Sequence, residues 1–197
     1  MKKLITQFLI LLFVFGIALA DDKGYVESLV KSKTEQILSV IRKKDISQQE
    51  KKQRIFDIAS PLFDFNTMGK LTLGRKYWTK LSPKQQKRFV DLFVKRLRIV
   101  YLDRADIYGN EKIDFEPAIQ KKKNIIYVPS KVITKDNKFS VLYKFWKSPE
   151  GWKIYDVEVD GVSIIRTYRS QFMAIIQKSG IDGLFKELEK LTQKSKK

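Results

Sequence analysis

The chain has 197 residues, of which 31% are charged, with 40 Lys and Arg residues against 22 Asp and Glu residues and a net charge of +18. It contains neither Cys nor His, which excludes disulfides, thiolate metal sites, imidazole bases and Ser-His-Asp triads. The strong positive charge points to an anionic partner, which is nucleic acid, a membrane surface or an acidic protein.

The first twenty residues have the pattern of a secretory signal peptide. Met1-Lys2-Lys3 is a cationic start, an uncharged apolar run follows, and Ala18-Leu19-Ala20 has the small residues of a cleavage site. The apolar run is at most about 17 residues long, short of the ~20 that span a bilayer, which favours cleavage after Ala20 over an uncleaved anchor. No Cys follows it for lipid attachment. We therefore expect a soluble periplasmic protein formed by residues 21–197 as a single domain.

The kind of cation in the sequence argues against nucleic acid as the partner. The chain has 31 Lys residues and only 9 Arg residues. Base and phosphate recognition favours the planar guanidinium fork, whereas the Lys ammonium is a hydrated point charge. An exported protein also has little access to nucleic acid, so we expect no nucleic-acid binding.

Residues 23–107 are predicted to be helical. Apolar residues at helical spacing, beginning with Val26, predict a first helix that ends near Lys44. Ser47 and Glu50 have the spacing of a capping box, in which the serine covers an unpaired amide and the glutamate reaches back to the cap. This motif predicts the start of a second helix.

Two further helices are predicted before the sheet. A short one runs from Asp64 to about Leu73 and is stopped by Gly74. The next begins at Ser82-Pro83, where a capping serine precedes a proline in the first helical position. Its apolar face is wider than that of an ordinary surface helix.

Near residue 111 the apolar period changes from helical to alternating. Alternating runs are found at 113–115, 126–132, 139–145 and 152–154, with turns at 120–124, 136–137, 149–151 and 160–161. Consecutive strands joined by short turns predict a four-stranded antiparallel meander. A helix over 162–178, ended by Gly180, and another from Asp182 follow. The predicted fold is α+β, with N-terminal helices, the meander and C-terminal helices.

The catalytic candidates are weak. Ser28 and Lys31 match the S-x-x-K motif of penicillin-binding proteins, but the companion motifs are absent. Asp156, Glu158 and Asp160 share one face of a strand and resemble a glycosidase carboxylate pair. A solvated strand face that leads into an Asp-Gly turn is the simpler interpretation. No glycine-rich phosphate loop is present, so we expect no enzyme, no cofactor and no metal.

The aromatic residues, 12% of the chain, leave two possibilities open. The apolar sheet face and the broad helix either pack into a solid core or line a cavity. A concave, mainly apolar cavity is the usual form of a small-molecule or lipid site.

Three stretches in order resemble one protein family. They are 63–68 (FDFNTM) with 73–78 (LGRKYW), then 81–86 (LSPKQQ) with Phe89, Leu92, Phe93 and Tyr101, then 151–157 (GWKIYDV), 160–165 (DGVSII), 168–172 (YRSQF) and 181–184 (IDGL). Their order and spacing are similar to those of the MlaC-type periplasmic phospholipid-binding proteins, also called the toluene-tolerance auxiliary family. The resemblance covers about residues 25–192.

The resemblance implies a monomeric soluble carrier that shuttles phospholipid between an outer-membrane lipoprotein complex and an inner-membrane ABC transporter, with transient contact to both. Acyl chains would lie in an apolar cavity between sheet and helices, and the headgroup would face solvent. Each buried methylene stabilises by about 0.8 kcal/mol, whereas an unpaired polar headgroup is costly to bury. No bond is made or broken in this function.

The expected cavity wall combines the sheet's alternating residues with apolar helical residues. They are Leu73, Phe93, Leu97, Val100, Tyr101, Val128, Val132, Phe139, Val141, Tyr143, Phe145, Trp152, Ile154, Ile165 and Phe172. Asp160, Gly161 and Ser163 are predicted to be turn and helix-cap residues. An exported protein-interaction or adaptor module with a solid core is the alternative. The headgroup, the number of acyl chains, a hopanoid-like cargo and the direction of transfer stay open.

Overall fold

The computed structural model describes residues 21–102, 112–135 and 137–193. The predicted signal peptide, the change of period near residue 111, residue 136 of one predicted turn and the lysine-rich end at 194–197 lie outside the described residues. Within the described ranges, no helix has both the length and the apolarity needed to cross a membrane.

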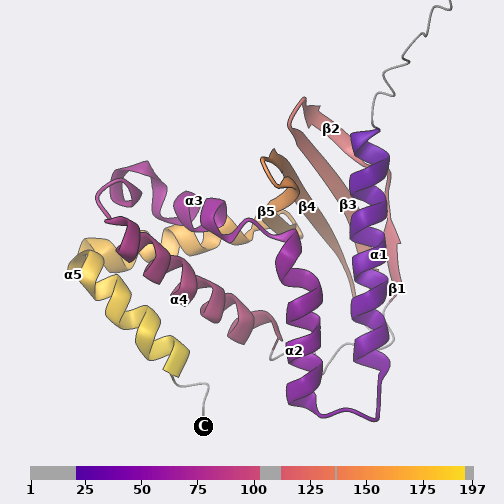
Figure 1. The fold of residues 1–197 in the computed structure, drawn as a ribbon, viewed down its shortest axis with the longest axis horizontal. Helices are drawn as coiled ribbons and strands as arrows, with labels where there is room; N and C mark the ends of the chain where they lie inside the picture. Colours follow the sequence, from indigo (N-terminus) through magenta and orange to yellow (C-terminus); the bar gives the residue numbers. More distant parts are fainter. Residues whose placement is uncertain (1–20, 103–111, 136, 194–197) are drawn as a thin grey trace, which may run out of the picture.

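Among the described residues, four helices and one short 3-10 turn precede the sheet (Figure 1). They are α1 (Asp22–Arg42), α2 (Gln48–Ala59), η1 (Ser60–Leu62), α3 (Phe65–Trp78) and α4 (Pro83–Leu102). The predicted cap of α2 is confirmed, because Ser47 Oγ accepts a hydrogen bond from the backbone N–H of Glu50 at 3.1 Å. The Glu50 side chain does not complete the box but binds Arg54 at 2.6 Å.

The starts and stops of α3 and α4 follow local signals. Ser82 and Gln85 form a reciprocal capping box, since each side chain accepts a hydrogen bond from the other residue's backbone N–H. The predicted stop at Gly74 is confirmed, because this glycine has φ 67° and ψ 161°, a conformation that side chains disfavour. The chain then resumes a short helical segment to Trp78, which the sequence did not predict.

The described residues form a sheet of six antiparallel strands. They are β1 (Lys112–Phe115), β2 (Ile119–Lys122), β3 (Ile125–Ile133), β4 (Lys138–Ser148), β5 (Gly151–Val159) and β6 (Val162–Ser163). The order is β1-β3-β4-β5-β6, and β2 also pairs with β3. The four predicted strands correspond to β1, β3, β4 and β5. Strand β2 overlaps the predicted turn at 120–124; all four of its residues are exposed, so it has no apolar alternation to reveal it.

The last helix, α5 (Ile164–Gln193), contains the predicted break. Gly180 has φ 68° and ψ −178°, which divides α5 into the two helices expected from the sequence. The first begins two residues later than predicted, because Val162 and Ser163 pair with β5 as β6. Ser163 is the helix cap, and its Oγ accepts from the backbone N–H of Arg166 at 3.1 Å.

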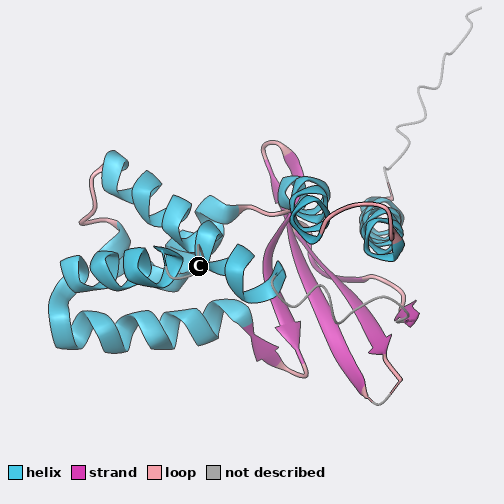
Figure 2. Ribbon diagram, turned by 90° about the horizontal axis from the view of Figure 1, so that it is seen from below, coloured by secondary structure: helices cyan, strands magenta, loops and turns pink. Residues whose placement is uncertain are grey.

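The apolar core consists of two clusters. Helices α1 and α2 lie over one side of the curved sheet, and α3, α4 and α5 form a separate layer beside it (Figure 2). Buried Val26 and Val30 of α1 belong to the sheet cluster. The helical cluster is built by α3, α4 and α5 around Phe89. Phe63 and Ile164 pack against both clusters, so they lie where the two layers meet.

Candidate functional site

The residues predicted to line a cavity are divided between the two clusters. The sheet cluster holds Val128, Val132, Val141, Phe145, Trp152 and Ile154 as buried residues, with Phe139 and Tyr143 partly buried against them. The helical cluster holds Leu73, Phe93, Ile165 and Phe172 as buried residues, with Leu97 partly buried. Val100 is half-buried and Tyr101 is 46% exposed, both near the C-terminal end of α4. The structure therefore brings thirteen of the predicted residues into two groups rather than onto one continuous wall.

Strand register places the predicted sheet residues on one face. Val128 is opposite Tyr143, and Val132 is opposite Phe139. Directly opposed residues of antiparallel strands point to the same side of the sheet. A β-bulge in the β4–β5 pairing then brings Phe145 opposite Ile154, which keeps both on that face. The alternation read from the sequence therefore identified this face correctly.

The apolar face includes one buried polar residue, Ser130, that the sequence analysis missed. Ser130 is buried, and its hydroxyl donates a weak hydrogen bond to the backbone oxygen of Val141 at 3.4 Å. Burial raises the pKa of Tyr143, opposed in part by a hydrogen bond with Ser130. The Tyr143 phenol therefore stays neutral across the physiological range. Ser130 occupies an inward position in the β3 alternation, which is the signal that identifies it.

Helix α1 is fixed over this face by polar contacts near its N-terminal end. The indole Nε1 of Trp152 donates to Asp22 at 3.0 Å, and Lys147 Nζ pairs with the same carboxylate at 2.8 Å. These contacts, led by Lys147, hold the pKa of Asp22 below its usual value. Farther along, Glu27 accepts from the backbone N–H of Ala118 at 3.0 Å. Trp152 therefore has an apolar ring in the core and a polar edge that anchors α1.

The segment before α3 joins the two layers. Phe63 forms a parallel bridge with Ile154, and the Asp64 backbone N–H donates to the Ile154 oxygen at 2.9 Å. The Asp64 carboxylate accepts from the backbone N–H of Thr67 at 2.8 Å, from its hydroxyl at 2.7 Å and from Trp146 Nε1 at 3.0 Å. The carboxylate of Asp64 therefore caps α3 and binds the sheet at the same time.

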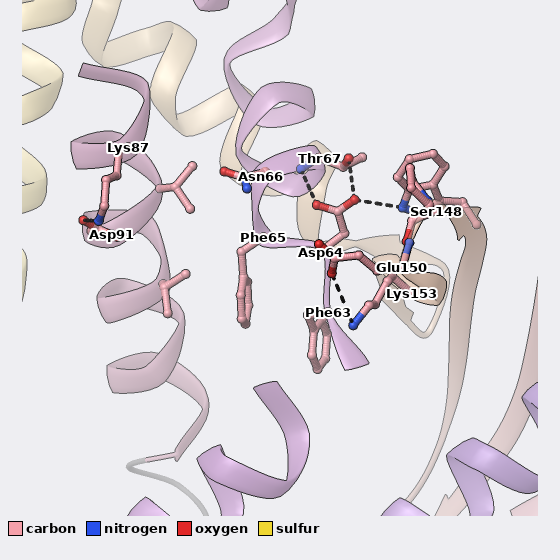
Figure 3. Close-up of a pocket in the computed structure, with 14 residues that line it drawn as sticks. Phe63, Asp64, Phe65, Asn66, Thr67, Lys87, Asp91, Ser148, Glu150 and Lys153 are labelled. Carbon is pink, nitrogen blue, oxygen red and sulfur yellow. Dashed lines mark hydrogen bonds and ion pairs between the residues drawn. The ribbon is translucent and has the colours of Figure 1, made fainter. Parts of the chain in front are cut away.

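A hollow of about 630 Å³ lies between this segment, α4 and the β4–β5 hairpin (Figure 3). The rings of Phe63 and Phe65 stack at 5.6 Å between centroids and form part of its wall. Lys87 and Asp91 pair across one turn of α4 at 2.7 Å, on another side of the hollow. None of the predicted cavity residues lines it. The motif at 63–68, which carried the family resemblance, is the sequence signal that points to this region.

The carboxylates of β5 have a structural role that differs in part from the prediction. Asp156 is only 5% exposed, so the expectation of a solvated carboxylate is wrong there. It accepts from Ser163 Oγ at 2.8 Å and from the backbone N–H of Ile165 at 3.2 Å, because α5 begins directly against it. Lys144 pairs with both Asp156 and Glu158. Arg166 also pairs with Glu158 at 3.3 Å, so one lysine and one arginine together balance the charges of Asp156 and Glu158.

The predicted turn after β5 is confirmed. Asp160 and Gly161 have φ 47° and 78°, which is the left-handed conformation of a tight turn. The Asp160 carboxylate accepts from the backbone N–H of Ser140 at 2.7 Å. Among the residues that the structure describes, no cluster of acidic side chains has the arrangement of a metal site.

Comparison with known proteins gives consistent matches. The family model described as MlaC protein matches residues 31–190. Toluene tolerance protein ttg2D of Pseudomonas putida is 29% identical over 143 residues, which are 69% of this chain and 66% of that protein. The intermembrane phospholipid transport system binding protein MlaC of Haemophilus influenzae is 27% identical over 135 residues, which are 66% of this chain and 62% of that protein.

A solved structure extends the comparison to three dimensions. The phospholipid-binding protein from Ralstonia solanacearum, in complex with a phospholipid, matches with a TM-score of 0.78 and 26% identity, over 87% of this chain and 98% of that one. The two curated relatives are matched over about two thirds of their length or less. Since the family match extends from residue 31 to residue 190 and the fold agrees, the chain belongs to the MlaC family.

Proposed function

We propose that the chain is a soluble periplasmic phospholipid carrier of an intermembrane transport system. The observation that carries this proposal is the match to almost the full length of a structure that holds a phospholipid. The matched relative from Haemophilus influenzae is named as a binding protein of such a system. We further propose that residues 1–20 are a signal peptide cleaved after Ala20 and that the mature chain is a monomer.

The cargo site we propose lies between the sheet and the helical layer. Residues that are fully buried, such as Phe93 and Phe145, already have their surface covered by protein. The predicted residues that are only partly covered offer apolar surface to an acyl chain. They are Leu97, Val100, Tyr101, Phe139 and Tyr143. Acyl chains reach the fully buried residues only if the two clusters move apart near Phe63 and Ile164.

The energetics favour burial of the chains and exposure of the headgroup. Each methylene removed from water stabilises the complex by about 0.8 kcal/mol, so two acyl chains offset much of the cost of leaving a bilayer. A charged phosphate would need paired donors in the interior. The partly buried Lys144 is already paired with Asp156 and Glu158 and is unsuited to a phosphate. The headgroup therefore faces solvent, and no chemical reaction is part of the proposal.

The proposed partners are an outer-membrane lipoprotein complex and an inner-membrane ABC transporter. A carrier between two membranes must receive its cargo from one complex and deliver it to another, so both contacts have to be transient. The net charge of the mature chain, +16 after removal of two lysines with the signal peptide, favours acidic docking surfaces.

Lipid extraction tests the proposal directly. The protein is expressed with its signal peptide, purified from the periplasm and analysed by native mass spectrometry and by lipid extraction. We expect phospholipid in near-stoichiometric amount, with the mass identifying its headgroup and separating phospholipid from a hopanoid-like lipid. A protein without a lipid adduct that also takes no lipid from labelled liposomes would instead be an adaptor with a solid core.

A further inference from the structure

Positive charge is concentrated in one part of the chain. Residues 65–102, which comprise α3, α4 and their connection, contain a single acid, Asp91. Their cations are Lys70, Arg75, Lys76, Lys80, Lys84, Lys87, Arg88, Lys95, Arg96 and Arg98. In the preceding segment, 21–64, acids and bases nearly balance. The excess charge of the described chain is therefore localised rather than spread evenly.

The exposed part of this charge lies at one end of the helical layer. Residues 70–84, which we call the α3–α4 tip, turn around at Gly74 and at the loop before Pro83, far from the sheet (Figure 1). Lys70, Arg75, Lys76, Lys80 and Lys84 are all exposed. No described carboxylate lies within ion-pair distance of any of these five cations. The tip cations are consequently available to an external anion.

Apolar side chains accompany these cations. Leu71 is 37% exposed. Tyr77 and Trp78 are half-buried, and Lys76 Nζ lies 5.4 Å from the centre of the Tyr77 ring. Aromatic rings and leucine beside lysines are the combination found where proteins contact the interface of a lipid bilayer.

The tip is held rigidly by the helical core. The Trp78 ring makes an edge contact with Phe89, with 6.5 Å between ring centres. The Gln86 side chain donates to the backbone oxygens of Trp78 and Leu81 at 3.0 and 3.3 Å. At Gly74 an added Cβ would lie 3.0 Å from Arg169 Nη2, so the bend is packed against α5. The cations are therefore presented on a fixed surface and lose little conformational entropy of the backbone on binding.

We propose that the α3–α4 tip is a docking surface for an anionic phospholipid bilayer. Its cations contact the headgroup phosphates, and Leu71 with the edge of Tyr77 enters the interface. Four of the five tip cations are lysines, which suit the diffuse charge of a lipid surface, whereas protein interfaces favour the bidentate guanidinium of arginine. This contact is with the membrane surface itself and does not require bound cargo.

Vesicle co-sedimentation with a charge-matched control tests this proposal. The probe vesicles are phosphatidylcholine alone or phosphatidylcholine with about a quarter phosphatidylglycerol. The tip variant is Lys76→Gln/Lys80→Gln/Lys84→Gln. The control variant is Lys122→Gln/Lys123→Gln/Lys138→Gln, which removes the same charge from exposed lysines of the sheet and of its β2–β3 turn. Thermal unfolding of each variant checks that it is folded.

We expect the unmodified protein to bind the anionic vesicles and to release them as salt is raised. The tip variant should bind up to about 100-fold more weakly, and the control within about threefold of the unmodified protein. Leu71→Ser should weaken binding without changing its salt dependence. Equal losses in tip and control variants would overturn the proposal, because net charge alone would then explain binding.

Two further outcomes would also overturn the proposal that the α3–α4 tip docks on an anionic bilayer. One is absence of binding to anionic vesicles. The other is a tip variant that loses affinity for soluble polyglutamate while vesicle binding is unchanged, which would assign the tip to an acidic protein. The lipid content of the same preparations is measured in parallel. Because the tip variant leaves the proposed cargo site intact, failure of the carrier proposal shows as missing lipid, while failure of the docking proposal shows only in vesicle binding.

Discussion

The indole Nε1 of Trp146 donates a hydrogen bond to Oδ2 of Asp64 at 3.0 Å, across 82 residues of sequence. The same carboxylate caps α3 through the backbone N–H of Thr67. One side chain therefore fixes both the start of a helix and the position of that helix against the sheet. Replacement of this carboxylate affects both layers at once.

We expect Asp64→Ala to lower the free energy of unfolding by about 2–3 kcal/mol, from the lost cap together with an unsatisfied indole donor. Chemical denaturation measures this change. Trp146→Phe removes the donor while keeping a ring, and the double variant completes a thermodynamic cycle. A coupling energy of at least about 0.5 kcal/mol is expected. Strictly additive effects would show that the bond does not link the layers.

A charge in the apolar face of the sheet should prevent lipid loading. Val141 is buried between β3 and β5, opposite Ser130 and Val159. In Val141→Glu the new carboxylate either loses its hydration in this apolar face, at a large cost in free energy, or keeps water where acyl chains would have to lie. We expect loss of co-purified phospholipid, measured by native mass spectrometry. Lys138→Glu, on the exposed start of β4, should load normally. Equal loading of both variants would place the cargo elsewhere.

Asp156 should be the most sensitive carboxylate of β5. It is buried and paired with Lys144, and it accepts from Ser163 and from the backbone of Ile165. Asp156→Ala removes one partner of a buried pair, so we expect a loss of about 3–5 kcal/mol in the free energy of unfolding. Asp160→Asn, in the exposed turn, serves as the control and should cost much less. Comparable losses would mean that burial of Asp156 is not what stabilises the start of α5.

The two glycine breaks should differ in their tolerance to alanine. Gly74 and Gly180 have nearly the same backbone conformation, which costs about 1–3 kcal/mol for a residue with a side chain. At Gly74 the new Cβ also meets Arg169, whereas at Gly180 nothing lies within 4 Å. Thermal denaturation should therefore show Gly74→Ala to be the less stable variant. The reverse order would indicate that Arg169 moves aside without cost.

Asp22 should make stability depend on pH in the acidic range. Its hydrogen bonds with Lys147 and Trp152 lower its pKa in the folded state. When the pH is above the unfolded-state pKa of about 3.9, the lowered folded-state pKa stabilises the fold. This contribution is lost as the pH falls through the folded-state pKa. The melting temperature of Asp22→Asn should lie below that of the unmodified protein at pH 7. The difference should close in strong acid, and a difference independent of pH would contradict this explanation.

Local signals predicted much of the fold. The caps at Ser47 and Ser82 and the breaks at Gly74 and Gly180 are each determined by a few adjacent residues, so the sequence was sufficient to locate them. Alternation likewise identified the buried face of β3, β4 and β5, because the register between neighbouring strands keeps opposed residues on one side.

Features that depend on distant segments could not be predicted in the same way. Asp156 is buried because α5 begins against it, and nothing in the strand sequence shows where that helix lies. Strand β2 pairs with β3, but all four of its residues are exposed, so its sequence has no alternation of buried apolar and exposed polar residues. Alternation also does not show which helices cover a face. The predicted cavity residues therefore form two clusters, and Phe63, which lies between them, was not among those predicted.

The parallel bridge between Phe63 and Ile154 has a consequence for the order of folding. Asp22, Glu27 and Phe63 each have at least one partner within residues 118–154, which are synthesised much later. The buried Val26 and Val30 of α1 therefore lack their sheet partners until the β4–β5 hairpin has been synthesised, although α1 can already pack against α2. Closing such long loops is slow. A chaperone that binds the nascent N-terminal third would thus act during the interval in which α1 lacks its sheet partners.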